Sequence, residues 1–266
     1  MSYLSPNMTM LLNAVKKASG SLNRDFSEIE RLQSSVKGYK EFVVAAYGRV
    51  FKALQVELGK IRPDYPLVSE VEKLPSKGGC YIVAPIDGLS NFAHGLPYFA
   101  ISLAVYENNA VTAALVYNPA SDEMFFAEKG AGAYKEGFRN HERLRVSARK
   151  DIKEALISTL VNYEKSAAEY EQLHHKIVAA SDNVRVFGAC ALDLAYVAAG
   201  KIDAAVSLGN KLAEFAAGML LVKEAGGYIY DINQKDKRTE DLSAVINSGN
   251  LIAVSAEMSK KLCELF

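Results

Sequence analysis

The residues best suited to chemistry lie in the segment Ala84-Pro85-Ile86-Asp87-Gly88-Leu89-Ser90-Asn91-Phe92. Here a strand is expected to end in a tight turn and a helix to begin, with Ser90 or Asp87 as its cap. Unbonded backbone N–H groups and the helix dipole at such a junction form a pocket for anions, and a neighbouring carboxylate can hold a divalent metal ion against a phosphate group. Because many folds contain this turn without any chemistry, the segment alone does not establish a site.

The elements before and after this segment must position it. Ser5-Pro6 is typical of a helix start, and apolar residues recur at helical spacing from about Glu41 to Leu58. Tyr81-Ile82-Val83 and the stretch from Tyr98 to Val105 are rich in strand-forming residues. Turn signals after residue 107 and after residue 117 then predict an antiparallel meander, in which residues 130–133 form a tight hairpin and not a dinucleotide-binding loop.

Strands and helices are expected to alternate after Arg149, which indicates a layered α/β arrangement. Gly226-Gly227 is typical of the end of a helix. The expected strands are residues 155–160, 184–187, 204–206 and 228–230, and the expected helices are a charged one through His174 and His175, then residues 192–199 and 216–223.

Composition excludes several classes of protein. The 266 residues include 31 Lys and Arg against 31 Asp and Glu, so no net charge attracts nucleic acid or an acidic membrane. Cys80, Cys190 and Cys263 lack metal-site spacing, and we expect three separate thiols. The longest uncharged stretch, residues 88–106, is interrupted by polar residues and cannot span a membrane. We expect a cytoplasmic protein without a secretory signal.

Several segments, in a fixed order along nearly the whole chain, resemble those of the inositol monophosphatase family, especially its bacterial extragenic-suppressor branch. They are Lys37-Gly38 with Phe42-Val43, Leu67-Val68-Ser69-Glu70, residues 84–92, residues 188–200, Ala216-Ala217-Gly218 and Glu224-Ala225-Gly226-Gly227. The resemblance implies a five-layer α-β-α-β-α sugar-phosphatase-like fold. It also implies an N-terminal lobe over residues 1–145, a C-terminal lobe over residues 146–266, and a homodimer.

The resemblance further implies Mg²⁺-dependent hydrolysis of inositol phosphate or another small phosphate ester. By position in the family motifs, the metal ligands would be Glu70, the carbonyl of Ile86, Asp87 and Glu214. Glu70 and Asp87 would also be the catalytic residues. Gly88, Leu89 and Ser90 would hold the phosphate.

The sequence departs from the family pattern at several residues that carry the chemistry. Ala84 stands where the family has an aspartate that bridges two metal ions, and Leu89 replaces a threonine that orients the attacking water. Three further acidic positions hold Tyr47, Val71 and Ser207, and the tryptophan-aspartate pair is Ala213-Glu214. Since Mg²⁺ prefers oxygen ligands, two-metal catalysis is expected to be weak or lost.

Three hypotheses follow from these departures. The chain is a family member with an eroded metal site and reduced Mg²⁺ affinity, or a non-catalytic binding protein that acts with the transcription antitermination machinery, or a slow phosphatase for another phosphate ester. Other reactive side chains are interpreted without chemistry. His174-His175 is expected on a solvated face, His94 receives no role, Cys190 is a buried thiol, and Lys235, Lys237 and Arg238 form a solvated loop.

Overall fold

The computed structural model describes residues 4–32, 39–234 and 243–266. The first of its two sheets has the order β1-β2-β3-β4-β5-β6-β7, in which β1 pairs parallel with β2 and the other neighbours are antiparallel. Its strands are β1 (Leu67–Val68), β2 (Gly79–Asp87), β3 (Ala100–Glu107), β4 (Ala110–Asn118), β5 (Glu123–Glu128), β6 (Gly132–Lys135) and β7 (Glu142–Arg143).

The second sheet has the order β11-β12-β10-β8-β9, with β8, β9 and β10 parallel and β12 antiparallel to both its neighbours. Its strands are β8 (Leu156–Val161), β9 (Asn183–Arg185), β10 (Ala204–Leu208), β11 (Tyr228–Asp231) and β12 (Leu251–Val254). The first sheet ends at Arg143 and the second begins at Leu156. The division into lobes 1–145 and 146–266 stays a prediction.

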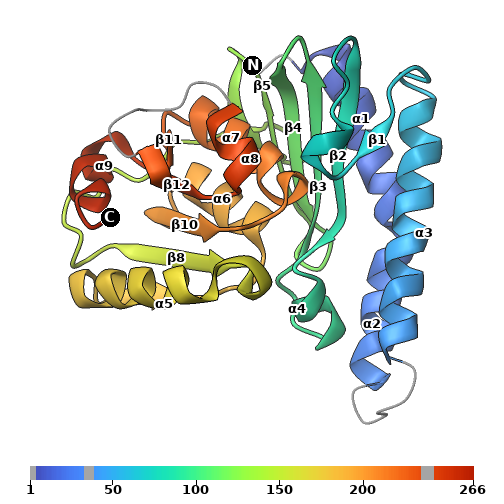
Figure 1. Cartoon of the computed structure of the whole chain (residues 1–266). Coiled ribbons are helices and arrows are strands. Elements are labelled where there is room, and N and C mark those ends of the chain that lie inside the picture. The colour runs from blue at the N-terminus through green and yellow to red at the C-terminus, as the bar shows by residue number, and fades with distance from the viewer. Residues whose placement is uncertain (1–3, 33–38, 235–242) are drawn as a thin grey trace.

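Helices and sheets stack in five layers (Figure 1). Three N-terminal helices cover one face of the first sheet, two helices fill the space between the sheets, and two more cover the outer face of the second sheet. In that order they are α1 (Pro6–Ala18), α2 (Leu22–Leu32) and α3 (Tyr39–Gly59); α6 (Cys190–Ala198) and α7 (Leu212–Glu224); and α5 (Tyr163–Ala180) and α9 (Ala256–Cys263). The predicted α-β-α-β-α fold is confirmed.

Strand β2 shows why the chain folds into layers. All nine of its residues are buried, because side chains alternate between two covered faces of the sheet. Tyr81 and Val83 belong to the apolar cluster under α1, α2 and α3. Ile82 and Ala84 belong to the cluster around α6 and α7. The strand that leads to the candidate site is therefore held on both sides.

Local sequence signals are confirmed at several element boundaries. The Ser5 hydroxyl accepts a hydrogen bond from Met8 N at 3.0 Å and caps α1, as predicted. The predicted tight hairpin joins β5 to β6, and the Glu224 carboxylate at the end of α7 accepts from the backbone N–H groups of Gly130 and Gly132 at 2.7 and 2.8 Å. One prediction is wrong: strand β9 ends at Arg185, before Val186 and Phe187.

The remaining elements are short. They are helix α4 (Leu89–Ala93), helix α8 (Ser243–Ser248) and three 3₁₀ turns at Ser19–Ser21, Val71–Lys73 and Ile232–Gln234. Cys80, Cys190 and Cys263 form no disulfide, as expected. In the ranges that the structure describes, no helix is long and apolar enough to cross a membrane.

Two glycines in helices give a matched test of packing between the layers. A Cβ on Gly218 of α7 would lie 2.6 Å from Leu194 Cδ1 of α6, whereas a Cβ on Gly48 of α3 would meet nothing within 4 Å. Gly218→Ala is expected to lower the free energy of unfolding by about 1–3 kcal/mol through overpacking. Gly48→Ala is expected to raise it by about 0.5–1 kcal/mol through helix propensity.

Urea denaturation of both variants measures the two changes. Effects of the same sign at the two glycines would contradict the close approach of α6 and α7.

Candidate functional site

The turn after β2 differs from the predicted cap. Gly88 itself is the N-cap residue of α4, with a left-handed backbone at φ +80°, and this cap involves no side-chain hydrogen bond. The prediction that Ser90 or Asp87 caps this helix is therefore wrong. A Cβ at Gly88 would lie 2.9 Å from both Ala189 Cβ and the Tyr98 carbonyl oxygen, so the turn needs glycine for its conformation and for its space.

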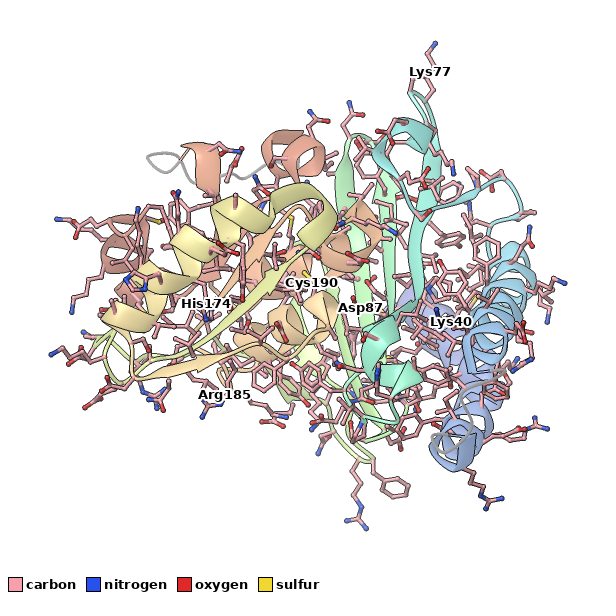
Figure 2. All side chains as sticks on the ribbon, turned by 60° about the horizontal axis from the view of Figure 1, so that its bottom comes forward. Lys40, Lys77, Asp87, His174, Arg185 and Cys190 are labelled. Atoms are coloured by element: carbon pink, nitrogen blue, oxygen red, sulfur yellow. The ribbon has the colours of Figure 1, made fainter. Side chains whose placement is uncertain are left out.

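Asp87 lies at the end of β2 and is only 4% exposed. Its Oδ2 accepts a hydrogen bond from Ala191 N, in the first turn of α6, at 2.7 Å. Burial raises the pKa of the Asp87 carboxyl well above its usual value, the charges of Glu214 and Asp193 raise it further, and the N–H groups of Ala191 and Cys190 oppose the shift. Figure 2 shows Asp87 and Cys190 close together in the interior between the first sheet and the helices behind it. This carboxylate therefore ties the strand to the helix layer.

Glu214 lies in the first turn of α7, which begins at Leu212 and not at residue 216 as predicted. Its Oε2 accepts from Lys211 N at 2.9 Å, and its own N–H donates to the Lys211 carbonyl oxygen. The pKa of Tyr47 in α3 is raised by burial and then by the charge of Glu214. Asp87, Glu214 and Tyr47 therefore share one electrostatic environment, and a phenol stands where the family has an acid.

Glu70 lies at the surface. Its side chain is 54% exposed and forms an ion pair with Lys73 at 2.8 Å. The hydrogen bond from Lys73, the charge of Lys73 and then the charge of Lys211 hold the pKa of Glu70 below its usual value. The three predicted carboxylates therefore have different surroundings: Asp87 is buried, Glu214 caps a helix, and Glu70 forms an ion pair at the surface.

The remaining residues of the predicted site, at substituted and at matching positions, are placed as follows. Ala84 and Ile86 are buried in β2, Val71 is half-buried against the core, and Leu89 is 42% exposed. Ser90 is exposed, and its carbonyl oxygen lies 2.8 Å from His94 Nδ1.

Ser207, at the position of an inositol contact, is buried on the inner face of the second sheet. Its hydroxyl accepts from Asn210 Nδ2 at 2.6 Å and lies 3.7 Å from Cys190 Sγ, which is buried as predicted.

These residues do not fit a pair of Mg²⁺ ions. In the part of the chain that the structure describes, no three His, Cys, Asp or Glu side chains gather in a way that could hold a metal ion. Each of the three predicted carboxylates already accepts a hydrogen bond or an ion pair from the protein. A single Mg²⁺ on Glu70, Ile86, Asp87 and Glu214 stays a prediction.

The sequence analysis missed a second buried acid, Asp193 of α6. Its Oδ1 accepts from the Tyr98 hydroxyl at 2.6 Å, and Tyr98 stacks on Phe187. Burial raises the pKa of Asp193 to about 7, while the hydroxyls of Tyr98 and Ser158 lower it. A lone acid in the apolar run Leu192-Asp193-Leu194 was the signal that could have identified it.

Other predicted features lie outside this site. His174 is half-buried, and its Nδ1 lies 3.2 Å from Thr159 Oγ1 and 3.3 Å from the Tyr170 hydroxyl, so the prediction of a solvated face is wrong for His174 and right for the exposed His175. The motif residues Lys37-Gly38 and the basic residues Lys235, Lys237 and Arg238 lie outside the described residues.

A family model and two curated relatives all relate this chain to one protein family. The model of the inositol monophosphatase family matches residues 4–266. An inositol-1-monophosphatase of Rhizobium meliloti is 36% identical, and the alignment covers 97% of this chain and 95% of the relative. A Nus factor SuhB of Xylella fastidiosa is 32% identical over 87% of this chain and 84% of the relative.

A solved structure supports the same grouping. The extragenic suppressor protein suhB from Bartonella henselae superimposes with a TM-score of 0.81 at 32% identity, and the match covers 99% of each chain.

Asp193 predicts a pH dependence of stability. The pKa of Asp193 is higher in the folded protein than in the unfolded chain, so the unfolded chain loses this proton at lower pH than the folded protein does. The stability contributed by the protonated carboxyl is therefore lost as pH rises from about 4 toward 7. Asp193→Asn keeps an acceptor for Tyr98 and removes the titration. Its stability relative to the unsubstituted protein is expected to rise by about 2 kcal/mol between about pH 5 and pH 7.

Urea denaturation across this pH range measures the difference. Tyr98→Phe serves as the control. Loss of the donating hydroxyl raises the pKa of Asp193, so the free energy of unfolding should continue to fall at higher pH in this variant. Parallel pH profiles of Asp193→Asn and the unsubstituted protein would contradict the assignment.

Proposed function

The chain belongs to the inositol monophosphatase family, and from this membership we propose that it is a member whose Mg²⁺-dependent hydrolysis of inositol phosphate is weak or lost. One observation carries the proposal. Buried Ala84 stands where the family has its bridging aspartate, and the nearby Asp87 carboxylate accepts a backbone N–H of α6. A methyl group supplies no ligand for a second metal ion, whose charge two-metal hydrolysis requires.

The phosphate-binding segment supports the same proposal. Leu89, at the position of the water-orienting threonine, presents an apolar and 42% exposed side chain. Removal of a positioned acid, base or water-orienting group costs about 10²–10⁴-fold in rate. The roles assigned to Gly88, Leu89 and Ser90, Mg²⁺ as cofactor, a homodimer and a cytoplasmic location remain predictions.

A second candidate function is a non-catalytic role with the transcription antitermination machinery. The observation that favours it is the similarity to relatives named Nus factor SuhB, such as that of Xylella fastidiosa. Such a role would use the surface of the fold and would not need the metal site. Loss of the metal ligand at residue 84 and of the water-orienting group at residue 89 would then be tolerated.

Restoration of the family residues tests the first proposal. A variant with Tyr47→Asp, Val71→Glu, Ala84→Asp and Leu89→Thr regains the oxygen ligands and the water-orienting hydroxyl. Release of phosphate from inositol 1-phosphate is expected to be at least about 100-fold faster than in the unsubstituted protein. Adding Asp87→Asn to this variant should abolish the gain. Equal rates in the unsubstituted protein and the variant, both dependent on Asp87, would contradict the proposal.

Affinity purification tests the second candidate. The tagged chain is expected to retain RNA polymerase or antitermination factors from a cell lysate, and the Rhizobium meliloti relative named inositol-1-monophosphatase serves as the matched bait. Absence of these proteins, or equal retention by both baits, would count against a specific role in antitermination.

A further inference from the structure

A cavity of about 400 Å³ opens on the outer side of the second sheet, away from the candidate site. Its walls come from α5, the end of β10, the 3₁₀ turn at Ile232–Gln234 and Phe266. Figure 1 shows α5 and α9 on this outer side of the sheet. Leu208, in the wall, belongs to the outer apolar cluster, whereas the preceding residue, Ser207, contacts Cys190 on the inner face. The sheet therefore separates this cavity from Asp87.

The polar side chains of the cavity are three amides, which both donate and accept hydrogen bonds, and one lysine. Of the residues that the structure describes, the polar ones lining it are Gln172, Lys176, Asn233 and Asn250, with no Asp or Glu side chain among them. Among the described residues, Lys176 forms no ion pair, so its ammonium charge is not compensated there. A cavity with a lysine, three amides and no acid favours a ligand that carries negative charge.

Asn250 gives the most specific indication. It is 9% exposed, and its Oδ1 accepts from Gly209 N at 2.7 Å. This bond fixes the orientation of the amide and leaves Nδ2 as the donor at the cavity wall. In the part of the chain described by the structure, no group accepts from Nδ2. A ligand oxygen in the cavity, which Asn250 lines, would accept from this donor.

The other lining residues of the cavity are apolar. Leu173, Leu208, Ile232 and Phe266 line it and belong to the outer apolar cluster or pack against it. A simple inorganic ion would leave these side chains in contact with water, whereas a ligand with an apolar body would cover them.

We propose that this cavity binds a small organic anion, with its acid group at Lys176 and Asn250 and its apolar body on Leu208 and Ile232. The acid group is a carboxylate or a phosphate monoester, since both accept from an ammonium and an amide. Because Gly209 follows Leu208 and is bonded to Asn250, the ligand would also contact the loop that leads to α7.

Backbone-amide NMR of the full chain tests the proposal with three probes. Benzoate and benzyl phosphate share an apolar ring and differ in the acid group, and inorganic phosphate lacks the ring. At least one ring-bearing probe is expected to bind saturably and to shift the amide signals of Gly209 and Asn250. The tighter of the two identifies the acid group, and inorganic phosphate is expected to bind more weakly than benzyl phosphate.

Two substitutions and a control localise the site. Lys176→Met is expected to weaken binding about tenfold by removing a charged hydrogen bond. Asn250→Asp keeps the acceptor for Gly209 N, adds a like charge and is expected to weaken binding as well. Lys77→Met is the matched control, because Lys77 lies just before β2 of the first sheet, at the upper edge of the molecule in Figure 2, and should leave binding unchanged.

Three results would overturn the proposal. They are the absence of saturable binding by both ring-bearing probes, equal weakening by Lys176→Met and Lys77→Met, and shifts confined to the amides around Asp87. Activity toward inositol 1-phosphate plays no part in this test, so its outcome is independent of the proposed function.

Discussion

The hydrogen bond from Ala191 N to Asp87 Oδ2 joins two layers of the molecule, the first sheet and the helices between the two sheets. It ties the end of β2 to the first turn of α6. Burying a carboxylate is costly unless it is hydrogen-bonded or protonated, and the raised pKa of Asp87 reflects that cost. Gly88 follows immediately, and its close approach to Ala189 depends on the same junction.

The rest of the fold holds this junction from both sides. Strand β2 is covered by α1, α2 and α3 on one face and by α6 and α7 on the other. The close contact of Gly218 with Leu194 lets α7 lie against α6, and this packing places Glu214 near Asp87. In this arrangement Glu214 caps its own helix and Glu70 pairs with Lys73, so both carboxylates have partners within the chain.

Much of this could be predicted from local sequence. Apolar periodicity and turn residues identified β2 and the meander, Ser5 identified the start of α1, and the motif order indicated the layered fold. Helix α2 received no prediction. It follows a 3₁₀ turn at Ser19–Ser21, yet its apolar residues Leu22, Phe26 and Ile29 recur at helical spacing, a local signal that could have identified it.

Other features depend on partners that are distant in sequence. The roles of Asp87 and Asp193 are set by Ala191 and Tyr98, which lie about a hundred residues away along the chain. Local patterns cannot show such partners. The cap at Gly88 was missed for a related reason: its positive φ and its contact with Ala189 arise from tertiary packing, whereas the prediction weighed only the side chains of the turn.

The central claim is that this family member lacks a working Mg²⁺ pair, and calorimetric titration of Mg²⁺ into the purified chain tests it most directly. The account predicts binding of at most one Mg²⁺ ion by the unsubstituted protein and binding of a second when Ala84→Asp is combined with Tyr47→Asp and Val71→Glu, because these changes return oxygen ligands beside Asp87. Binding of two Mg²⁺ ions by the unsubstituted protein would contradict it.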